Sequence, residues 1–296
     1  MKRREMLRSS AAAALAASAF PVGWTAAAEK KTQRILYFTR NVGYYHSVVQ
    51  RGDNPLSHSE KILVELGKQN GIELECTKDG RVFDGGLDQY DAFAFYTNGD
   101  LTLPNKQEEP PMTQKGKERF LQAINDGKGF VGFHSSCASW RTPGPKVANA
   151  DKVDPYIAML GGEFIAHGPQ QKAKMRVTSP AFPGMDGLGR SFDLHDEWYA
   201  LKNFQKDLHV ILVQDTEGMK GDCYQRPAFP STWARMQGKG RVYFTALAHR
   251  EDVWESKVLA QIVLGGFAWV LGNVDAEIPA NIDLVTPKSR QLTSDG

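Results

Sequence analysis

The sequence has few cysteines, no marked excess of one charge and no long uninterrupted hydrophobic run. Its three cysteines, Cys76, Cys137 and Cys223, are far apart and show no CxxC spacing. This pattern argues against a zinc ribbon and against a scaffold built on disulfides, because at most one disulfide can form. The longest apolar segments are too short or too interrupted to span a bilayer, which takes about 20 strongly apolar residues.

The charge balance depends on the first 28 residues. The whole chain has 36 Lys and Arg residues against 34 Asp and Glu residues. Residues 1–28 contain four basic residues and one acidic residue, so the rest of the chain has a net charge near −1. Its Lys and Arg residues do not cluster, as those of a nucleic-acid-binding surface do. We therefore expect no nucleic-acid partner.

The N-terminus has the features of an export signal. Arg3 and Arg4 lie in the pattern Arg-Arg-x-Met-Leu-Arg, which is similar to the twin-arginine signal. An alanine-rich apolar run at 11–20 leads to Ala-Ala-Ala at 26–28, a small-residue cleavage site. An ordinary N-terminal helix would explain neither feature. We expect residues 1–28 to be a signal peptide and the mature protein, without a membrane anchor, to be periplasmic or secreted through the twin-arginine pathway.

Alternating strand and helix patterns indicate a parallel sheet in the first half of the mature chain. Apolar runs predict strands at 34–39, 72–77, 91–97 and 129–134, and apolar periodicity predicts helices at 57–69 and 113–125. Strands linked by crossover helices at this spacing form a parallel sheet. Because ligands bind beyond the carboxyl ends of such strands, we expect the functional site at that edge.

The second half of the chain is richer in predicted strands. We expect strands at 172–178, 191–199 and 209–214, a hairpin formed by 231–237 and 241–246, and a last helix at 256–271. Residues 273–296 are polar and contain two prolines, so this tail either drapes over the domain or is loose. We expect one domain over residues 29–272.

The turn after the strand at 129–134 reads His134-Ser135-Ser136-Cys137. In hydrolase-like folds such a turn holds the nucleophile, with a glycine on each side. Here Gly132 precedes the turn but no glycine follows it, and nothing nearby in the sequence clearly lowers the pKa of the Cys137 thiol. A buried structural cysteine is therefore favoured over a nucleophile.

Several ionisable residues occur together at 193–197. In an extended strand Asp193, His195 and Glu197 share one face, which suits metal ligation or proton transfer unless the strand is a solvated edge. His249 follows the last predicted strand and is a candidate ligand or base. His167 is another candidate.

Five stretches, taken in order, resemble the ThuA-like, or trehalose-utilisation, family. They are the loop ending at His46, the segment 132–135, the segment 161–167, the segment 183–188 leading to Asp196-Glu197-Trp198-Tyr199, and the segment from Trp233 to His249. The resemblance covers residues 33–272. It implies the class I glutamine amidotransferase-like fold, a flavodoxin-like three-layer α/β/α sandwich, here with β-rich additions in the second half. It also implies a role in disaccharide metabolism, in which 3-keto sugars are intermediates, without the amidotransferase cysteine.

Two functions are compatible with these residues. The first is a hydrolase or lyase that cleaves a glycoside or a 3-keto-glycoside with the help of a metal ion. Its expected catalytic residues are Glu197, His134 and His249, and its expected carbohydrate-binding residues are Tyr44, Tyr45, His46, Trp198 and Tyr199. The second is a non-catalytic sugar-binding or scaffold protein on the same fold.

The positions of the histidines predict a metal site. We expect His134, His195, Glu197 and His249 to converge at the carboxyl edge of the sheet, with His46 closing over them. Imidazoles and one carboxylate suit zinc, manganese or iron better than calcium, which prefers oxygen ligands. The alternative is a polar cleft whose histidines hydrogen-bond to one another or to a sugar.

Overall fold

The computed structural model describes residues 32–292, so the expected signal peptide lies outside the described residues. From Thr32 onward the chain forms one compact unit. In this described part no helix has both the length and the apolar character needed to cross a membrane.

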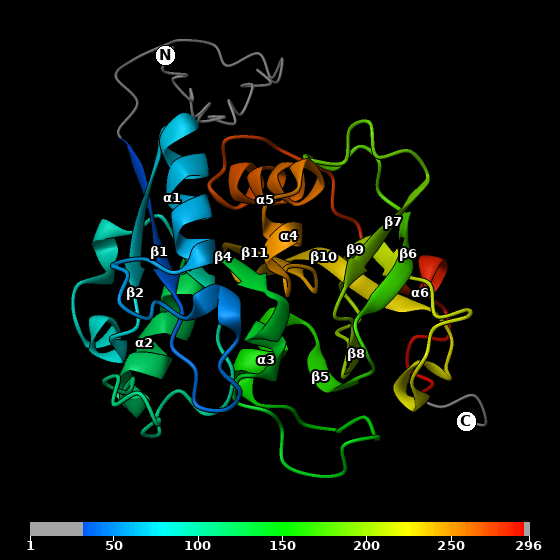
Figure 1. Ribbon diagram of the computed structural model, residues 1–296, viewed down its shortest axis with the longest axis horizontal. Helices are drawn as coiled ribbons and strands as arrows, with labels where there is room; N and C mark the ends of the chain where they lie inside the picture. Colours follow the sequence, from blue (N-terminus) through cyan, green and yellow to red (C-terminus); the bar gives the residue numbers. More distant parts are fainter. Residues whose placement is uncertain (1–31, 293–296) are drawn as a thin grey trace, which may run out of the picture. The chain divides into compact units, whose positions relative to one another are not determined.

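A mixed nine-stranded sheet runs through this unit in the order β2-β1-β3-β4-β11-β10-β9-β6-β7 (Figure 1). Its strands are β1 (Gln33–Phe38), β2 (Ile72–Thr77), β3 (Ala92–Phe95), β4 (Gly129–Phe133), β6 (Gln171–Val177), β7 (Ser191–Asp196), β9 (His209–Gln214), β10 (Phe229–Gln237) and β11 (Gly240–Thr245). The strands from β2 to β11 in this order are parallel, and the remaining pairs are antiparallel. A second sheet pairs β5 (Glu163–His167) with β8 (Tyr199–Lys202).

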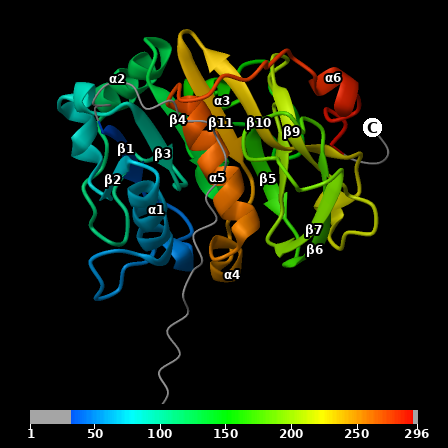
Figure 2. The ribbon, with the colours of Figure 1, turned by 90° about the horizontal axis from the view of Figure 1, so that it is seen from above.

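The helices cover both faces of the parallel strands. They are α1 (His58–Gln69), α2 (Gln114–Asn125), α3 (Pro155–Leu160), α4 (Glu251–Trp254), α5 (Lys257–Val270) and α6 (Ile282–Val285). On one face Tyr37 of β1 donates a hydrogen bond to Ser59 of α1. On the other face the Phe95 ring of β3 stacks on Phe120 of α2. Figure 2 shows α1 and α5 on one side of these strands and α2 and α3 on the other.

Local sequence signals explain where the helices begin. Ser57 and Glu60 form a capping box at the start of α1, and Thr113 and Ser256 accept main-chain N–H groups at the starts of α2 and α5. Such caps satisfy N–H groups that have no partner within the helix. The first-half strands and helices expected from the sequence are therefore confirmed to within a few residues.

The carboxyl ends of the five parallel strands meet at one edge of the sheet; these strands are β2, β1, β3, β4 and β11. The chain passes from β1 to β2 on one side of β1, while β3 lies on the other side, so the strand order reverses at β1. In open α/β sheets ligands bind beyond the carboxyl ends of the strands at such a reversal. β7 is four antiparallel steps from β11, so it runs in the same direction as the parallel strands. Residues that follow β1, β4, β7 and β11 thus share this edge.

One expectation about the second half needs revision. The strand predicted at 191–199 is two strands, because β7 ends at Asp196 and β8, in the other sheet, begins at Tyr199.

The C-terminal tail follows the first of the two expected alternatives as far as it is described. It packs on the domain, since Ile282 is buried and Asn281 donates a hydrogen bond to the Val210 carbonyl of β9.

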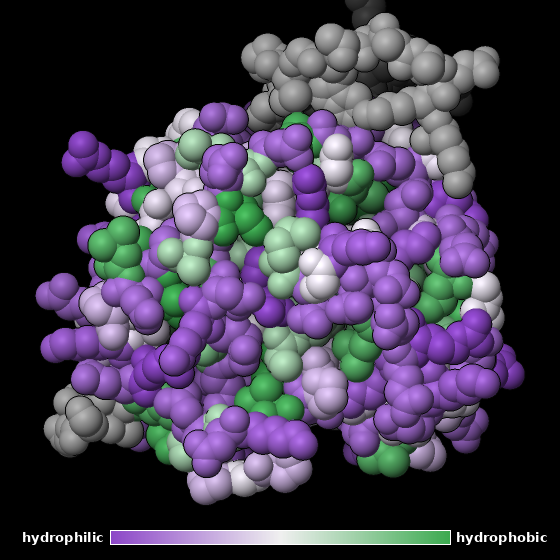
Figure 3. Space-filling model, turned by 180° about the vertical axis from the view of Figure 1, so that it is seen from behind, coloured by the Kyte–Doolittle hydropathy of each residue, from purple (hydrophilic) through white to green (hydrophobic). Residues whose placement is uncertain are grey.

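The reverse face of the molecule is mostly polar. Figure 3 shows it from behind, with apolar side chains lying singly or in small groups among polar ones. The large hydrophobic side chains that are exposed in the described residues, such as Leu284 on α6, come from separate elements. Scattered apolar residues of this kind are normal on a soluble surface.

Candidate metal centre

Four potential metal ligands meet at the carboxyl edge of the sheet. His46 follows β1, His134 follows β4 and begins the short helix η4 (His134–Ala138), Glu197 follows β7, and His249 follows β11. One donor atom from each side chain lies within 4.8 Å of the others. The edge thus gathers three imidazoles and one carboxylate from positions spread over 200 residues.

The spacing of these side chains fits a common ion. His249 Nδ1 lies 3.2 Å from Glu197 Oε2 and 3.3 Å from His134 Nε2, and His134 Nε2 lies 3.5 Å from Glu197 Oε2. The three imidazole centroids are 5.1–5.2 Å apart and the rings are steeply inclined to one another. Ligand atoms about 2.1 Å from one ion are about 3.0–3.4 Å apart at octahedral to tetrahedral angles. For His134, Glu197 and His249, only small movements would bring these atoms around an ion, while a donor atom of His46 lies within 4.8 Å of theirs.

His134 occupies a strained turn that presents its ring to the site. Its φ of 38° lies in the left-handed region, which residues other than glycine seldom adopt. The bend requires Gly132, because a Cβ there would lie 2.7 Å from the Ser136 hydroxyl. His134 thus stands where hydrolases with this turn carry the nucleophile, two residues after a glycine. Its Nδ1 donates to the Ala246 carbonyl at 2.8 Å, so in the neutral ring the unprotonated Nε2, which faces Glu197 and His249, is the atom that can bind a metal.

Cys137 has a structural position in the same turn. Its side chain is fully buried, and its thiol donates to the His134 carbonyl. Burial raises the pKa of the Cys137 thiol well above its usual value, so the thiolate needed for nucleophilic attack is disfavoured. This setting agrees with the expectation that Cys137 is not a nucleophile.

Asp196 holds the turn that carries His249, a role that the sequence analysis missed. Its carboxylate accepts N–H groups from Ala248 at 2.9 Å, His249 at 3.4 Å and Arg250 at 3.2 Å. These bonds stabilise the turn even though Ala248 has an unfavourable φ of 92°. The acidic pair Asp196-Glu197 at a strand end was the available signal. Sequence alone does not reveal that the first carboxylate binds main chain while the second faces the histidines.

Electrostatics favours the protonation states that a metal ion needs. Burial tends to raise the pKa of Glu197, but hydrogen bonds and charges from His134 and His249 outweigh it and lower that pKa far below its usual value. Burial and the charges of His134 and His249 lower the pKa of His46. The site therefore offers an ionised carboxylate and a neutral His46 imidazole, both of which bind metals. Among the described residues, His46 Nδ1 is buried without a hydrogen-bond partner.

Of the expected carbohydrate-binding aromatics, Tyr199 and Tyr44 lie at the site. The Tyr199 hydroxyl is 3.2 Å from His46 Nε2, and its ring is 4.0 Å from the His134 ring. The Tyr44 ring contacts His46 edge-on and is 70% exposed, so it has a free face beside the site.

Tyr45 and Trp198 are placed differently from the expectation. The Tyr45 hydroxyl donates to Glu109 at 3.1 Å, and its ring lies under the Lys78 ammonium. Trp198 is fully buried, and its indole N–H donates to the Gln171 carbonyl at 2.8 Å. The expectation that Trp198 binds sugar is wrong, because its ring has no accessible face.

His195 does not join the four ligands. It is exposed on β7 opposite Lys172, outside the cluster found among the described residues. The expectation that His195 converges with Glu197 is wrong because β7 stops at Asp196, so strand alternation does not extend to Glu197. His46, expected only to close over the site, takes the fourth position.

Two further side chains border the cluster. His167 Nδ1 lies 3.3 Å from Glu197 Oε1, and its ring stacks on Tyr199 with centroids 5.8 Å apart. The Gln170 amide nitrogen lies 3.0 Å from His249 Nε2. His167 was a candidate from the sequence, whereas Gln170 was not recognised because it contacts the site through the fold alone.

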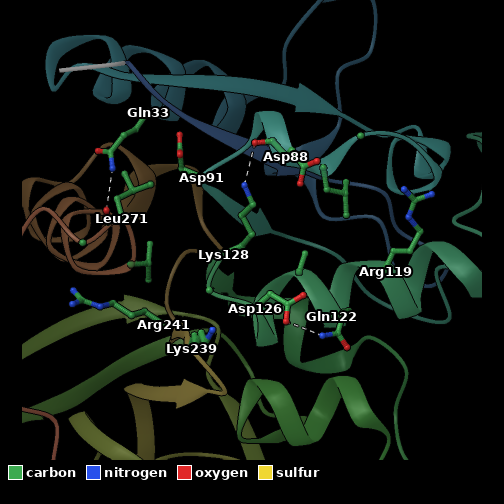
Figure 4. A pocket seen from close by; sticks show the side chains of 16 residues that line it. Gln33, Asp88, Asp91, Arg119, Gln122, Asp126, Lys128, Lys239, Arg241 and Leu271 are labelled. Carbon is green, nitrogen blue, oxygen red and sulfur yellow. Dashed lines mark hydrogen bonds between the residues drawn. The ribbon is translucent and has the colours of Figure 1, made fainter. Parts of the chain in front are cut away.

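A separate hollow lies at the opposite, amino edge of the sheet. It has a volume of about 710 Å³ and is lined by charged side chains (Figure 4). Three of its cations bind main-chain carbonyls: Arg119 donates to Asp84, Lys128 to Asp88 and Arg241 to Trp269. These cations are therefore engaged within the chain, and we place the functional site at the carboxyl edge despite the size of this hollow.

Comparison with known proteins agrees with this fold. The ThuA family model, described as trehalose utilisation, matches residues 34–270, so the chain belongs to the ThuA family. A ThuA-like protein from Bacteroides uniformis ATCC 8492 is 18% identical with a TM-score of 0.60, and one from Parabacteroides merdae ATCC 43184 is 15% identical with a TM-score of 0.58. Each match covers 85% of this chain and 95% of the other. No curated protein matches the chain.

Proposed function

We propose that this ThuA-family chain is an exported metal-dependent enzyme that cleaves glycosides or their 3-keto derivatives. The observation that carries the proposal is the convergence of His46, His134, Glu197 and His249 at the carboxyl edge of the sheet. Family membership supports a function related to trehalose utilisation, and hence a small carbohydrate substrate. Export rests on the N-terminal sequence alone. Helices on both faces of the parallel strands support a flavodoxin-like, class I amidotransferase-like sandwich.

The four side chains suit zinc, manganese or iron. A divalent ion bound here would polarise a carbonyl oxygen of the substrate and stabilise the negative charge that develops on it. With four protein ligands a zinc ion would be nearly saturated, whereas six-coordinate manganese or iron would keep open positions for substrate.

The proposed reaction is an elimination followed by addition of water. In a 3-keto-glycoside the carbonyl at C3 acidifies the proton on C2. A base removes this proton, and the electron pair of the broken C2–H bond forms the C1–C2 double bond. The C1–O bond breaks, and the leaving alcohol takes up a proton. Water then adds across the double bond to give the free 3-keto sugar.

The chain offers several bases for the proton on C2. Glu197, His134 and His249 are candidates when they are not all held by the ion. His167 is a stronger candidate on geometry, because it contacts Glu197 at 3.3 Å but is outside the four ligands, and its side chain is 45% exposed. Tyr44 and Tyr199 are placed to contact the sugar beside the base.

The second candidate function is sugar binding without catalysis. The contacts among His46, His134 and His249 and the exposed face of Tyr44 also suit a polar cleft for a sugar. Stacking and hydrogen bonding of this kind need no ion. Metal content therefore separates the two functions.

The test is metal analysis of the mature chain after incubation with zinc, manganese or iron and removal of excess ion. We expect about one ion per chain, and at least tenfold weaker binding in Glu197→Gln and His46→Gln, because each removes a ligand. His195→Gln, a histidine change outside the cluster, should retain the ion. The metal-loaded chain should release glucose from 3-keto-trehalose. Absence of any stoichiometric ion from the wild type, with sugar binding retained, would favour the second function.

A further inference from the structure

Arg141 is a cation whose hydrogen-bonding groups are unused. It follows the η4 turn, and its guanidinium carbon lies 5.4 Å from the centre of the Phe164 ring. Among the described residues its side chain has no hydrogen bond or ion pair, and Nε is buried without a partner. A guanidinium carries five N–H donors, and a partly buried one normally binds carbonyls or carboxylates. Arg141 is therefore prepared for a partner outside the described chain.

The nearby carboxylate does not neutralise Arg141. Glu163 is fully buried, and its Oε2 accepts a hydrogen bond from Asn203 at 2.8 Å. Its Oε1 lies 3.9 Å from the Lys202 ammonium, which makes Lys202 its counterion. Burial lowers the pKa of Lys202, and the positive charge of Arg141 lowers it further, whereas the negative charge of Glu163 raises it. The charges of Lys202, Glu163 and Arg141 therefore lie close enough to interact. This group has one surplus positive charge, carried by Arg141.

A strip of accessible rings leads from the metal centre to Arg141. His167 contacts Glu197, and the Phe164 ring lies 6.3 Å from the His167 ring. Both rings pack on Tyr199: the centroid of the Phe164 ring is 4.2 Å from that of Tyr199, and the centroid of the His167 ring is 5.8 Å away. His167 is exposed, and Phe164 and Arg141 are partly exposed. Sugar rings bind on such aromatic faces, so a substrate that starts at Glu197 can extend along this strip.

We propose that Arg141 binds an oxyanion, a carboxylate or phosphate group carried by the substrate of the metal centre. The planar guanidinium matches the two oxygens of such a group and forms strong charge-assisted hydrogen bonds with them. The substrate class is then a saccharide that carries an acidic group, which the site would bind more tightly than a neutral sugar of the same size. This inference rests on the proposed function for the identity of the site, but its binding test requires neither metal nor turnover.

The experiment is titration calorimetry of the mature chain with glucuronate, glucose 6-phosphate and glucose. At least one acidic sugar should bind about tenfold or more tightly than glucose. Arg141→Gln should abolish this preference while leaving glucose binding unchanged. Lys146→Gln, which removes an exposed cation from the same loop, should retain it. Preference for glucuronate alone identifies a carboxylate receptor, and preference for glucose 6-phosphate identifies a phosphate receptor.

Equal affinity of the wild type for all three sugars would overturn the proposal, and so would a preference that survives Arg141→Gln. Arg141→Lys keeps the positive charge but loses the planar guanidinium, so it should retain a weaker preference for the acidic sugar. It also serves as a control in case Arg141→Gln misfolds. Metal content is measured in parallel. An acid preference that depends on Arg141 in a chain that binds no metal would support this inference and contradict the proposed function.

Discussion

His46, one of the four proposed metal ligands, has a pKa that its burial changes strongly. In the folded chain its pKa lies well below the usual value, because burial and the charges of the neighbouring histidines disfavour the protonated ring. In the unfolded chain His46 titrates near 6.5. Below about pH 6.5 the unfolded state therefore binds a proton that the folded state does not, and stability decreases as the pH falls.

We therefore predict that His46→Asn reduces the acid sensitivity of the metal-free protein. Urea unfolding in the presence of EDTA at pH 8 and pH 5.5 should show a smaller loss of unfolding free energy in the variant than in the wild type. His195→Asn, which changes an exposed histidine on β7, should behave like the wild type. Equal losses in His46→Asn and the wild type would show that His46 is protonated in both states.

Among the secondary-structure elements, the ends of β7 and β11 shape the candidate metal centre. Asp196 closes β7 and binds the main chain of the turn after β11, so one carboxylate connects the two strand ends. Burial raises the pKa of Asp196 above its usual value, and the charge of His134 and the main-chain N–H donors offset this effect only in part. Residues that orient metal ligands in this way commonly affect metal affinity about 10–100-fold.

We predict that Asp196→Asn destabilises the fold by about 2 kcal/mol or more, because the amide accepts fewer of the N–H groups and leaves buried donors unpaired. Its metal affinity should fall at least tenfold as the His249 turn loosens. Urea unfolding and metal titration measure the two effects. Asp193→Asn, an exposed change on the same strand, should alter neither. Retention of metal affinity in Asp196→Asn would show that the turn holds its shape without this carboxylate.

For the molecule as a whole, the proposed export signal precedes the described domain in the sequence. Arg3 and Arg4 lie outside the described residues, so the localisation remains a prediction from the sequence. A metal-loaded domain suits the twin-arginine route, because its substrates generally cross the membrane folded. This reasoning connects the proposed metal centre with the proposed export.

We predict that replacing Arg3 and Arg4 together with Lys leaves the precursor in the cytoplasm, because the paired arginines are the defining feature of the signal. Fractionation and immunoblotting should show that only the unchanged chain is processed near Ala28. A strain without the twin-arginine translocase should give the same defect. Processing that continues normally in that strain would contradict the proposed route.

Local signals in the sequence predict the parallel half of the sheet, and a general rule about parallel strands predicts the positions of two of the four proposed ligands. Apolar runs and helix caps are local signals, and they located β1, α1, α2 and β4 because neighbouring residues decide these elements. His134 and His249 followed from a general rule, since residues after parallel strands meet at one edge. Glu197 was also identified, although the strand alternation used to place it does not reach that residue.

The side chains that complete the candidate centre are set by contacts between distant parts of the fold. The break between β7 and β8 turned Glu197 inward and left His195 exposed, and it depends on Tyr199 pairing in a different sheet. His46 joined the ligands and Trp198 entered the core because of packing between distant segments. Asp196 binds a turn more than 50 residues away, and Arg141 is recognisable only because no residue from 32 to 292 hydrogen-bonds to its side chain. Contacts between such distant residues leave no local pattern, because the folded chain alone brings them together.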